Sequence, residues 1–534
     1  MEKRIMLDQC GYLPEMKKKV TIRSAEPVGF QVYKSSGEKV YEGMADRMIE
    51  NEASKETLAV GDFSPLEAEG VYMIRADKLG ESDYFTISTS VYKEAYDESM
   101  EFFYLQRCGE VKAEYAGRFA HCACHTGLAT IYGEDTKIDV SGGWHDAGDY
   151  GRYVGPAAMT VAQLLLAYEE NETLAEGTLA SFEGETKLPP VLEEIKYELD
   201  FMLKMQREDG CLYHKVTCRS FCGFIMPEDE TEELIVSPVS VTATADFAAA
   251  MAMAVKFYEP YDSDYAEKLE KAARKAYDAA LALELPGGFL NPDGITTGQY
   301  EDDCDEDERY WAAAELYKSF GDERYRKDFE AIARRKIYHG YGWADMGSYG
   351  NIAYLTTSRP VDEALQKRMM DDMVKKAETY LAAVQTDVYG VCLKPDEYIW
   401  GSNLMVCNRG RMLVDAYHIT KDKKYLDAAR EQIHYLLGRN ANGISYLTGT
   451  GTDYVRHPHH RPSAFLGVAM RGMLSGGPCQ WIADEVAKDL LSNETPPAKC
   501  FLDMTGSYST NEVTIYWNSA FIWLLAGTIG KVRE

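Results

Sequence analysis

Residues 141–153 have the sequence Ser-Gly-Gly-Trp-His-Asp-Ala-Gly-Asp-Tyr-Gly-Arg-Tyr, in which two carboxylates, Asp146 and Asp149, stand three positions apart. Asp and Gly are poor formers of regular structure, so the stretch predicts a turn or an irregular helix start. In a turn, both carboxylates can face one small volume beside the aromatic side chains of the same stretch. Carboxylates next to aromatic platforms are typical of sites that act on sugars, whereas an isolated pair is more often an acidic surface turn.

The composition narrows the class of protein to which this turn belongs. The chain has 534 residues, 46% of them hydrophobic, which is enough for one large domain and a smaller one. Its net charge of −29 argues against nucleic acid and anionic membranes as partners and suits a neutral substrate. No apolar run predicts a membrane span. Twelve cysteines are too few for a disulfide scaffold, so most are expected to be buried thiols in a reducing compartment.

The first 90 residues predict a small all-β domain, 1–90. Runs rich in Val, Ile, Tyr and Phe alternate with turn residues at 4–7, 19–23, 29–33, 71–75 and 84–88. About seven strands at this spacing suggest an immunoglobulin-like sandwich.

Residues 91–534 predict a second, mainly α domain. Long loops rich in Gly, Pro and aromatic residues are expected at 285–300, 338–354 and 438–462, and such loops are commonly functional. Apolar residues recur at helical spacing in the following stretches: 97–106, 157–169, 188–206, 242–257, 264–283, 307–320, 322–337, 361–385, 402–420, 424–437 and 516–529.

The 141–153 motif resembles the signature of glycoside hydrolase family 9, and further motifs follow in the family's order. His457-Pro-His-His-Arg-Pro-Ser463 resembles the family's histidine motif. Ser509-Thr-Asn-Glu-Val-Thr-Ile-Tyr-Trp-Asn518 resembles the segment that carries its catalytic acid. Trp400-Gly-Ser-Asn403, Leu437-Gly-Arg-Asn440 and Ser445-Tyr-Leu-Thr-Gly-Thr-Gly451 fit the same family, and Leu7-Asp-Gln-Cys-Gly-Tyr-Leu13 resembles the opening of the immunoglobulin-like domain found in one branch.

This resemblance implies a mainly α fold, in which an (α/α)6 barrel follows a small all-β immunoglobulin-like sandwich. It also implies hydrolysis of β-1,4-glucosidic bonds with inversion. Matched to the family pattern, Asp149 is the general base, Asp146 helps to hold the same water, and Glu512 is the general acid. An inverting enzyme keeps its acid and base roughly 6.5–9.5 Å apart to leave room for that water.

Glu512 is expected to carry a raised pKa, supplied by its apolar neighbours Val513, Ile515 and Trp517 or by negative charge nearby. The competing interpretation is structural, because residues 510–512 precede an apolar helix and Glu512 would then be a partner in its N-terminal cap.

The histidine motif has two interpretations. By composition, His457 to Arg461 is a candidate metal site, but neighbouring side chains in an extended loop diverge. The family resemblance instead implies that His459 and Arg461 donate hydrogen bonds to sugar hydroxyls, and the planar, permanently charged guanidinium suits that role. For His457 and His460, an ordinary loop histidine is the alternative.

A second group of residues predicts a metal site. Cys108, Cys124, His125 and His145 supply two thiolates and two imidazoles, the ligand set of a closed tetrahedral zinc site in which the metal is structural. Their spacing is not that of a zinc finger. The resemblance implies structural Zn²⁺ at these positions, as in some bacterial members of the family. His145 directly precedes Asp146, so the metal would brace the catalytic turn. Cys122, with His121, is the alternative ligand.

The acidic run from Asp302 to Glu308 is a candidate calcium site by its carboxylates, although a solvated loop leading into a helix N-terminus explains the same run. Ca²⁺ is therefore a possible cofactor without assigned ligands. Candidate platforms for sugar rings, each with core packing as the alternative, are Trp311, Trp343, Trp400, Tyr446 and Tyr508.

The N-terminal residues contain no apolar signal region and no small-residue cleavage site, so we expect a cytoplasmic protein, or a secreted one if the chain is a mature form. A cytoplasmic enzyme would meet cello-oligosaccharides rather than crystalline cellulose. Alternatives within the family are an exo-acting β-glucosidase and an exo-β-glucosaminidase. Alternatives from other classes are a zinc-dependent hydrolase and a non-catalytic sugar-binding protein. Oligomeric state is not predicted.

Overall fold

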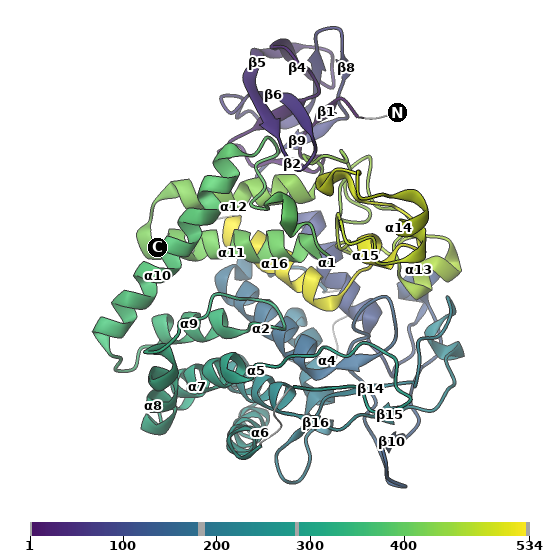
Figure 1. Ribbon diagram of the computed structural model, residues 1–534, viewed down its shortest axis with the longest axis vertical. Coiled ribbons are helices and arrows are strands. Elements are labelled where there is room, and N and C mark those ends of the chain that lie inside the picture. Colours follow the sequence, from purple (N-terminus) through teal and green to yellow (C-terminus); the bar gives the residue numbers. More distant parts are fainter. Residues whose placement is uncertain (1–2, 180–186, 284–287, 530–534) are drawn as a thin grey trace. The chain divides into compact units, whose positions relative to one another are not determined.

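The structure is a computed structural model that describes residues 3–179, 187–283 and 288–529 (Figure 1). The chain divides into two compact units, Met1–Phe102 together with Lys376–Glu534, and Phe103–Lys375. Within the described ranges, every helix is too short or too polar to span a lipid bilayer.

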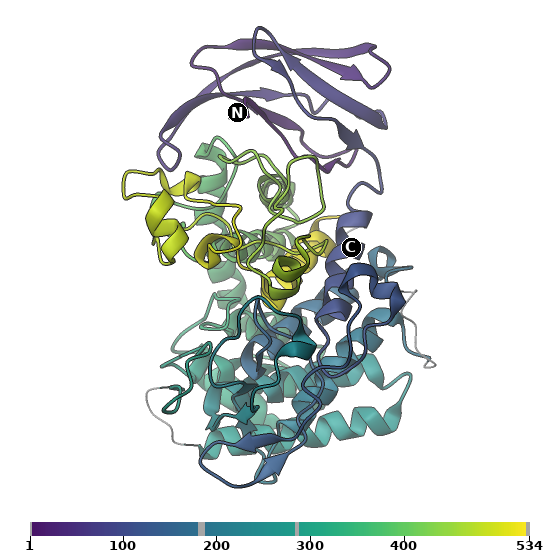
Figure 2. The same cartoon turned by 90° about the vertical axis from the view of Figure 1, so that its right-hand side faces the viewer.

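The first unit begins with an all-β domain, which Figure 2 shows from a second side. Its strands pair in the order β1-β3-β6-β5-β4-β7-β9-β2, with β8 beside β7. The long strand β5 joins the two halves of this order, because its first part pairs with β4 and its last part with β6. The strand bounds are β1 Ile5–Met6, β2 Gly11–Tyr12, β3 Lys19–Ile22, β4 Val28–Lys34, β5 Lys39–Asn51, β6 Glu56–Asp62, β7 Gly70–Ala76, β8 Gly80–Glu81 and β9 Phe85–Ile87.

The core of this domain follows from the alternation of side chains along its strands. Phe30 and Val32 of β4 face inward with Ile74 of β7, and all three are fully buried. The Tyr12 ring makes an edge contact with Phe63 at 5.4 Å between centroids. Each run predicted as a strand overlaps an observed strand, so the all-β N-terminal region is confirmed.

The remainder of the first unit is helical. Helix α16 (Ile515–Thr528) is buried along its whole length and contacts α11 (Ser402–Thr420) and α12 (Lys423–Leu436). A helix that is apolar on every side belongs in the interior of a protein. The shorter helices of the unit are α13 (Arg461–Leu466), α14 (Glu485–Leu490) and α15 (Tyr508–Asn511).

The motif at residues 7–13 attaches the β domain to α12. The buried Asp8 carboxylate lies 2.8 Å from His434 Nδ1 and accepts a hydrogen bond of 2.9 Å from the Tyr92 hydroxyl. Gln9 donates to the Gly443 carbonyl at 3.1 Å. Buried polar groups need such partners, so the motif serves to join the domain to the helix.

The second unit contains most of the other helices. Its alanine-rich helix α5 contacts α2, α6 and α7, and Figure 1 shows these helices side by side. Small side chains permit that close approach. The helices are α2 (Val154–Glu170), α3 (Glu172–Ala175), α4 (Pro190–Lys204), α5 (Val241–Tyr258), α6 (Ser263–Ala282), α7 (Glu306–Phe320), α8 (Glu323–Ala333) and α9 (Gly347–Thr356). The boundaries between the two units fall within helices α1 (Lys93–Gln106) and α10 (Glu363–Thr386).

Short strands cover one end of this second unit. They pair in the orders β11-β10-β15-β14-β12 and β13-β16. Their bounds are β10 Ala129–Ile131, β11 Lys137–Ile138, β12 Arg152–Tyr153, β13 Leu212–Tyr213, β14 Lys215–Thr217, β15 Ile235–Val236 and β16 Val239–Ser240. Strand β12 forms the last two residues of the 141–153 stretch, so this sheet positions the two carboxylates.

The predicted helical stretches all contain helices, but the loop predicted at 338–354 is wrong in part. Helix α9 begins at Gly347 inside that range. A Cβ atom at Gly350 would lie 2.8 Å from the Tyr310 ring, so the helix packs there through glycine. Close packing favours glycine at this position although glycine disfavours a helix. Of the loop predicted at 285–300, residues 285–287 lie outside the described residues.

Candidate active site and metal centre

The stretch 141–153 forms an irregular turn that is held from both sides. The Asp146 amide donates to the Gly151 carbonyl at 2.9 Å, which closes the loop around both carboxylates. Gly143 has a positive φ of 78°, and a Cβ atom there would lie 2.6 Å from the Phe201 ring. The Trp144 indole donates to Glu194 of α4 at 2.8 Å. Glycine and a buried carboxylate thus fix the backbone just before Asp146.

The two carboxylates of the turn occupy different surroundings. Asp149 is 8% exposed, and its Oδ2 accepts the Gly151 amide at 2.9 Å and the Tyr153 hydroxyl at 3.2 Å. Asp146 is 1% exposed, and its Oδ2 accepts a hydrogen bond from the Tyr300 hydroxyl. Burial, and then the charge of Asp149, raise the pKa of Asp146 well above its usual range. The arrangement favours a neutral Asp146.

Sequence reasoning missed Tyr300. It lies 154 positions from Asp146, in the segment before the acidic run, and no motif marks it. Its backbone φ of 48° is in the left-handed region, which residues other than glycine rarely adopt. Such conformations gather at functional sites because the surrounding structure must enforce them. Here the enforced conformation directs the phenol to the catalytic turn.

Glu512 lies in the first unit, directly after α15. Its carbonyl accepts the Gly476 amide at 2.9 Å, and its backbone forms an isolated parallel bridge with His459. Helix α16 is capped by Thr514, whose hydroxyl accepts the Trp517 amide at 3.0 Å. The N-terminal cap of α16 is thus Thr514, two residues after Glu512.

The apolar residues expected beside Glu512 are present. Val513, Ile515 and Trp517 are all buried. The Trp517 ring lies against Gly476 and Gly401, where an added Cβ atom would approach it to 2.9 and 3.1 Å. The 400–403 motif thus has a packing function, because it supports the segment that carries Glu512.

The histidine motif places its side chains on different partners. His459 Nδ1 lies 2.6 Å from the Thr505 carbonyl, and His460 Nδ1 lies 2.8 Å from the Ser463 hydroxyl. Arg461 begins α13 and is 6% exposed. The two neighbouring rings diverge, as expected for a loop, and do not converge as ligands of one metal. The structure brings the backbones of His459 and Glu512 together.

Each of the two units contains an aromatic pair that is a candidate for stacking on sugar rings. In the first unit, Trp400 is 38% exposed and its ring centroid lies 5.1 Å from that of Tyr508. In the second unit, Trp343 lies 5.3 Å from Tyr300, edge to face. Accessible aromatic faces next to carboxylates suit the stacking of sugar rings.

Two of the predicted platforms are wrong. Trp311 and Tyr446 are both completely buried. Trp311 packs against Tyr349 at 5.1 Å, and Tyr446 packs against Phe501 at 5.1 Å. These rings contribute to the core and cannot meet a sugar.

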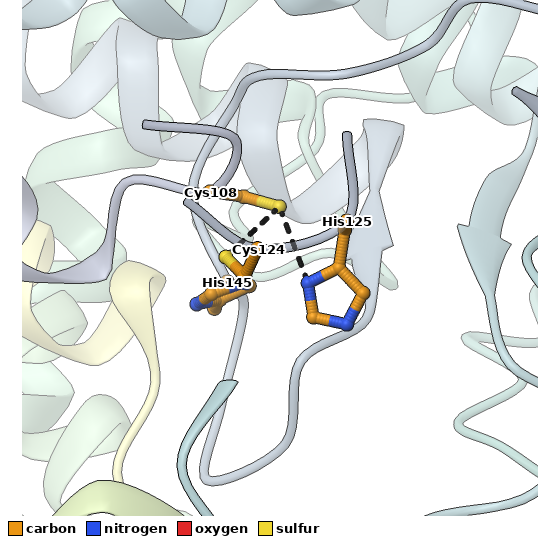
Figure 3. A group of neighbouring side chains, drawn as sticks. All are labelled: Cys108, Cys124, His125 and His145. Carbon is orange, nitrogen blue, oxygen red and sulfur yellow. Dashed lines mark hydrogen bonds between the residues drawn. The ribbon is translucent and has the colours of Figure 1, made fainter. Parts of the chain in front are cut away.

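The four predicted metal ligands converge on one point, as Figure 3 shows. Cys108 Sγ lies 3.6 Å from His125 Nδ1 and 3.9 Å from Cys124 Sγ, and Cys124 Sγ lies 3.7 Å from His145 Nε2. A tetrahedron with Zn–S bonds of about 2.3 Å and Zn–N bonds of about 2.0–2.1 Å has S···S edges of about 3.8 Å and S···N edges of about 3.5–3.6 Å. The donor atoms therefore fit zinc in both type and spacing.

The surroundings of this group are those of a metal site. Its four side chains are buried, as expected for a structural metal site. His125 Nε2 lies 2.9 Å from Glu230, a carboxylate that orients the ring from behind. The alternative ligand Cys122 is exposed and lies outside the group.

The acidic run at residues 302–308 is more buried than a solvated loop. Asp307 and Glu308 lie in the first turn of α7 and are almost inaccessible. Asp307 accepts the Met346 amide at 2.7 Å, and burial followed by the charge of Asp246 raises the pKa of Glu308. The predicted helix N-terminus is confirmed for these two residues, but their predicted exposure to solvent is wrong. Calcium binding stays a prediction.

Comparisons with known proteins decide the family. The model of Glycosyl hydrolase family 9 matches residues 92–525, and that of the cellulase N-terminal ig-like domain matches residues 1–81. The chain belongs to glycosyl hydrolase family 9. The family 9 chain is 37% identical to a cellodextrinase of Butyrivibrio fibrisolvens, over 99% of its own length and all of that protein. It is 38% identical to endoglucanase D of Acetivibrio thermocellus, over 99% of its length and 84% of that protein.

Solved structures agree with this assignment. The family 9 chain matches the structure of AaCel9A in complex with cellobiose-like isofagomine, with a TM-score of 0.93, 35% identity and coverage of 99% and 100% of the two chains. It also matches a Zn-binding triple mutant of the family 9 endoglucanase J30, with a TM-score of 0.90, 33% identity and coverage of 98% and 100%. The predicted fold class, an (α/α)6 barrel after an all-β immunoglobulin-like domain, is confirmed. The protein is a glycosidase of the endoglucanase type that acts on β-1,4-glucans.

Proposed function

We propose that this family 9 enzyme hydrolyses cello-oligosaccharides with inversion, with Asp149 as general base and Glu512 as general acid. The observation that supports the base most directly is the contrast within the turn. Asp149 is 8% exposed, and two donors hold one of its oxygens, whereas Asp146 is 1% exposed. A base must be ionised and must reach a water. Asp146 then serves to hold that water beside Asp149.

The acid is assigned to Glu512 because of its neighbours. It shares a backbone bridge with His459, a motif residue suited to sugar hydroxyls, and it is followed by buried apolar residues. Tyr508 and Trp400 form an aromatic pair in the same unit. An acid flanked by a hydrogen-bonding histidine and stacking rings is equipped to protonate a glycosidic oxygen. We assign His459, Arg461, Trp343, Trp400 and Tyr508 to substrate binding.

The stereochemistry of the first product tests inversion. Cellotetraose should yield its new reducing end as the α anomer, because water attacks the face opposite to the leaving group. Proton NMR within the first minutes, before mutarotation, distinguishes the anomers. A β anomer would refute inversion and the assignment of Asp149 as base.

A product profile separates the remaining alternatives. Cellohexaose, mixed-linkage β-glucan and a chitosan hexamer should be compared by chromatography. We expect internal or terminal cleavage of cellohexaose and little action on the cationic hexamer. Preferred release of glucosamine would establish the exo-β-glucosaminidase alternative, and glucose alone would establish the β-glucosidase.

We also propose that Cys108, Cys124, His125 and His145 hold a structural zinc ion. Four protein ligands fill a tetrahedron, so no coordination position is left for a reacting water. Bound zinc would supply a crosslink. It would tie the end of α1 to His145 and so fix the residue before Asp146. The proposal of a catalytic zinc hydrolase is correspondingly disfavoured.

Removing the metal should destabilise the protein before it affects chemistry. Cys124→Ser is expected to lose about one equivalent of zinc and about 3–4 kcal/mol of stability, as for a ligand at 100 to 1,000 times its Kd. Elemental analysis and thermal unfolding measure both quantities. Cys122→Ser is the matched control, since that exposed thiol lies nearby and outside the group. Instant inactivation by a chelator with unchanged circular dichroism would contradict a structural role.

A further inference from the structure

A lysine that the catalytic scheme leaves unused lies behind the base. Lys215 belongs to β14, and its residue is completely buried. Its ammonium donates to the Asn291 side chain at 2.6 Å, the Thr297 hydroxyl at 3.0 Å and the Gly298 carbonyl at 2.5 Å. A buried ammonium is costly unless hydrogen bonds and an opposite charge compensate it. The three acceptors satisfy its donors, and the opposite charge has to come from elsewhere.

That opposite charge is Asp149. In the antiparallel pair of β12 and β14, Lys215 stands directly opposite Tyr153, so the two side chains lie on the same face. The ammonium lies 5.5 Å from the centre of the Tyr153 ring, and the Tyr153 hydroxyl donates to Asp149. Burial lowers the pKa of Lys215 to about 7, and the charge of Asp149 acts against that effect. The two charges therefore interact across the tyrosine.

The acceptors of Lys215 connect the base to the second carboxylate. Asn291, Thr297 and Gly298 belong to the segment that leads to Tyr300, whose hydroxyl donates to Asp146. An added Cβ at Gly298 would lie 3.3 Å from the Tyr153 hydroxyl, so this segment packs on the same ring. The ammonium thus binds the segment that orients Asp146, and it lies over the ring of Tyr153, whose hydroxyl donates to Asp149.

We propose that Lys215 is a positioning residue for the general base, whose buried ammonium lies across the Tyr153 ring from Asp149 and whose hydrogen bonds hold the Tyr300 segment against the catalytic turn. This inference rests on the proposed role of Asp149. Lys215 itself is too buried to touch substrate. Its charge acts on the base through space, and its hydrogen bonds act on Asp146 through Tyr300.

The other titratable groups around the pair do not replace this charge. Asp146 adds a carboxyl, and Tyr153 and Tyr300 add phenols. His214, the neighbour of Lys215, faces the Ser240 hydroxyl and the Gln299 carbonyl, and burial lowers its pKa to about 3. It is therefore neutral in the working range of pH. Arg152 of β12 is a second buried cation near the turn, and its guanidinium donates to the carbonyls of Val140 and Gly142.

Neutral replacements of Lys215 test the inference through the pH profile. Lys215→Met and Lys215→Gln should move the acidic limb of kcat/KM on cellotetraose to higher pH by about one unit, because a carboxylate that loses a nearby cation binds its proton more tightly. We expect kcat at the optimum to fall about tenfold and KM to change less than threefold, since substrate does not meet this side chain. Lys215→Arg, which keeps the charge, should retain the wild-type limb.

A second buried lysine supplies the control. Lys18 is equally inaccessible, and its ammonium donates to the carbonyls of Pro14 and Met16 in the β domain. Lys18→Met should lower stability without moving the limb. If Lys215→Met does not fold, Lys215→Gln decides the question. If a folded Lys215→Met or Lys215→Gln variant keeps the acidic limb of the wild-type pH profile, whether or not its kcat is lower, the inference is overturned. Activity of Asp149→Asn would instead overturn the proposed function.

Discussion

Glu512→Gln is expected to lower kcat on cellotetraose by about 10³-fold, the contribution of a well-placed general acid. Glutamine has the same shape but cannot give a proton to the departing oxygen, so the sugar would have to leave as an alkoxide. KM and thermal stability should stay close to wild type, because the backbone contacts of residue 512 with Gly476 and His459 do not involve the carboxyl.

The leaving group distinguishes loss of the acid from general damage. On 2,4-dinitrophenyl β-cellobioside, whose phenolate leaves without protonation, Glu512→Gln should lose less than about tenfold in kcat. Glu485→Gln is the matched control, since Glu485 has an 89% exposed side chain paired with Lys488 in the same unit. Full activity of Glu512→Gln on cellotetraose would remove Glu512 from the mechanism, and equal losses on both substrates would point to misfolding.

The candidate metal site is the part of the structure that residue types and their order in the sequence predicted well. Cysteine and histidine have few other reasons to gather, so Cys108, Cys124, His125 and His145 could be chosen from sequence, and their atoms fall within 4.8 Å of one another. The helices were predictable for a similar reason. Burial of one face leaves a periodic pattern, as α6 and α12 show with acidic and basic residues on their outer faces.

Contacts between distant positions explain what the sequence did not disclose. Tyr300 and Lys215 adjoin the catalytic turn because β14 pairs with β12 and Lys215 of β14 binds the distant segment that leads to Tyr300. Neither residue lies in a motif.

The predictions of Trp311 and Tyr446 as platforms for sugar rings were wrong for a different reason. Tryptophan is equally useful in a core and under a sugar, so its identity does not decide its exposure. Trp311 stands before three alanines of α7, in a helix buried on every side, whereas Trp400 stands in a turn before α11. The residues that flank each tryptophan would have distinguished the buried Trp311 from the exposed Trp400. Helix α9 was missed because glycines that permit close packing also weaken the helical pattern.

Asp149→Asn is expected to reduce kcat by about 10³-fold or more on both cellotetraose and the dinitrophenyl substrate, because an amide cannot accept the proton of the attacking water. The leaving group does not matter here, in contrast to the acid variant. The amide can still accept the hydrogen bonds of Gly151 and Tyr153 through its oxygen, so the turn should keep its shape. Asp135→Asn is the control, since that side chain is exposed in the preceding hairpin.

Adding azide to the Asp149→Asn variant tests both the role of Asp149 and the stereochemistry of the reaction. The azide ion carries its own lone pair and no proton, so it can attack the anomeric carbon without a base while Glu512 protonates the leaving oxygen. The C–O bond breaks, a C–N bond forms, and an inverting site must deliver the α-glycosyl azide. NMR of the isolated product reads that configuration. A β-glycosyl azide would mean that the attacking group enters from the other face, and then Asp149 could not be the base, because the residue that activates water must lie on the side from which water arrives.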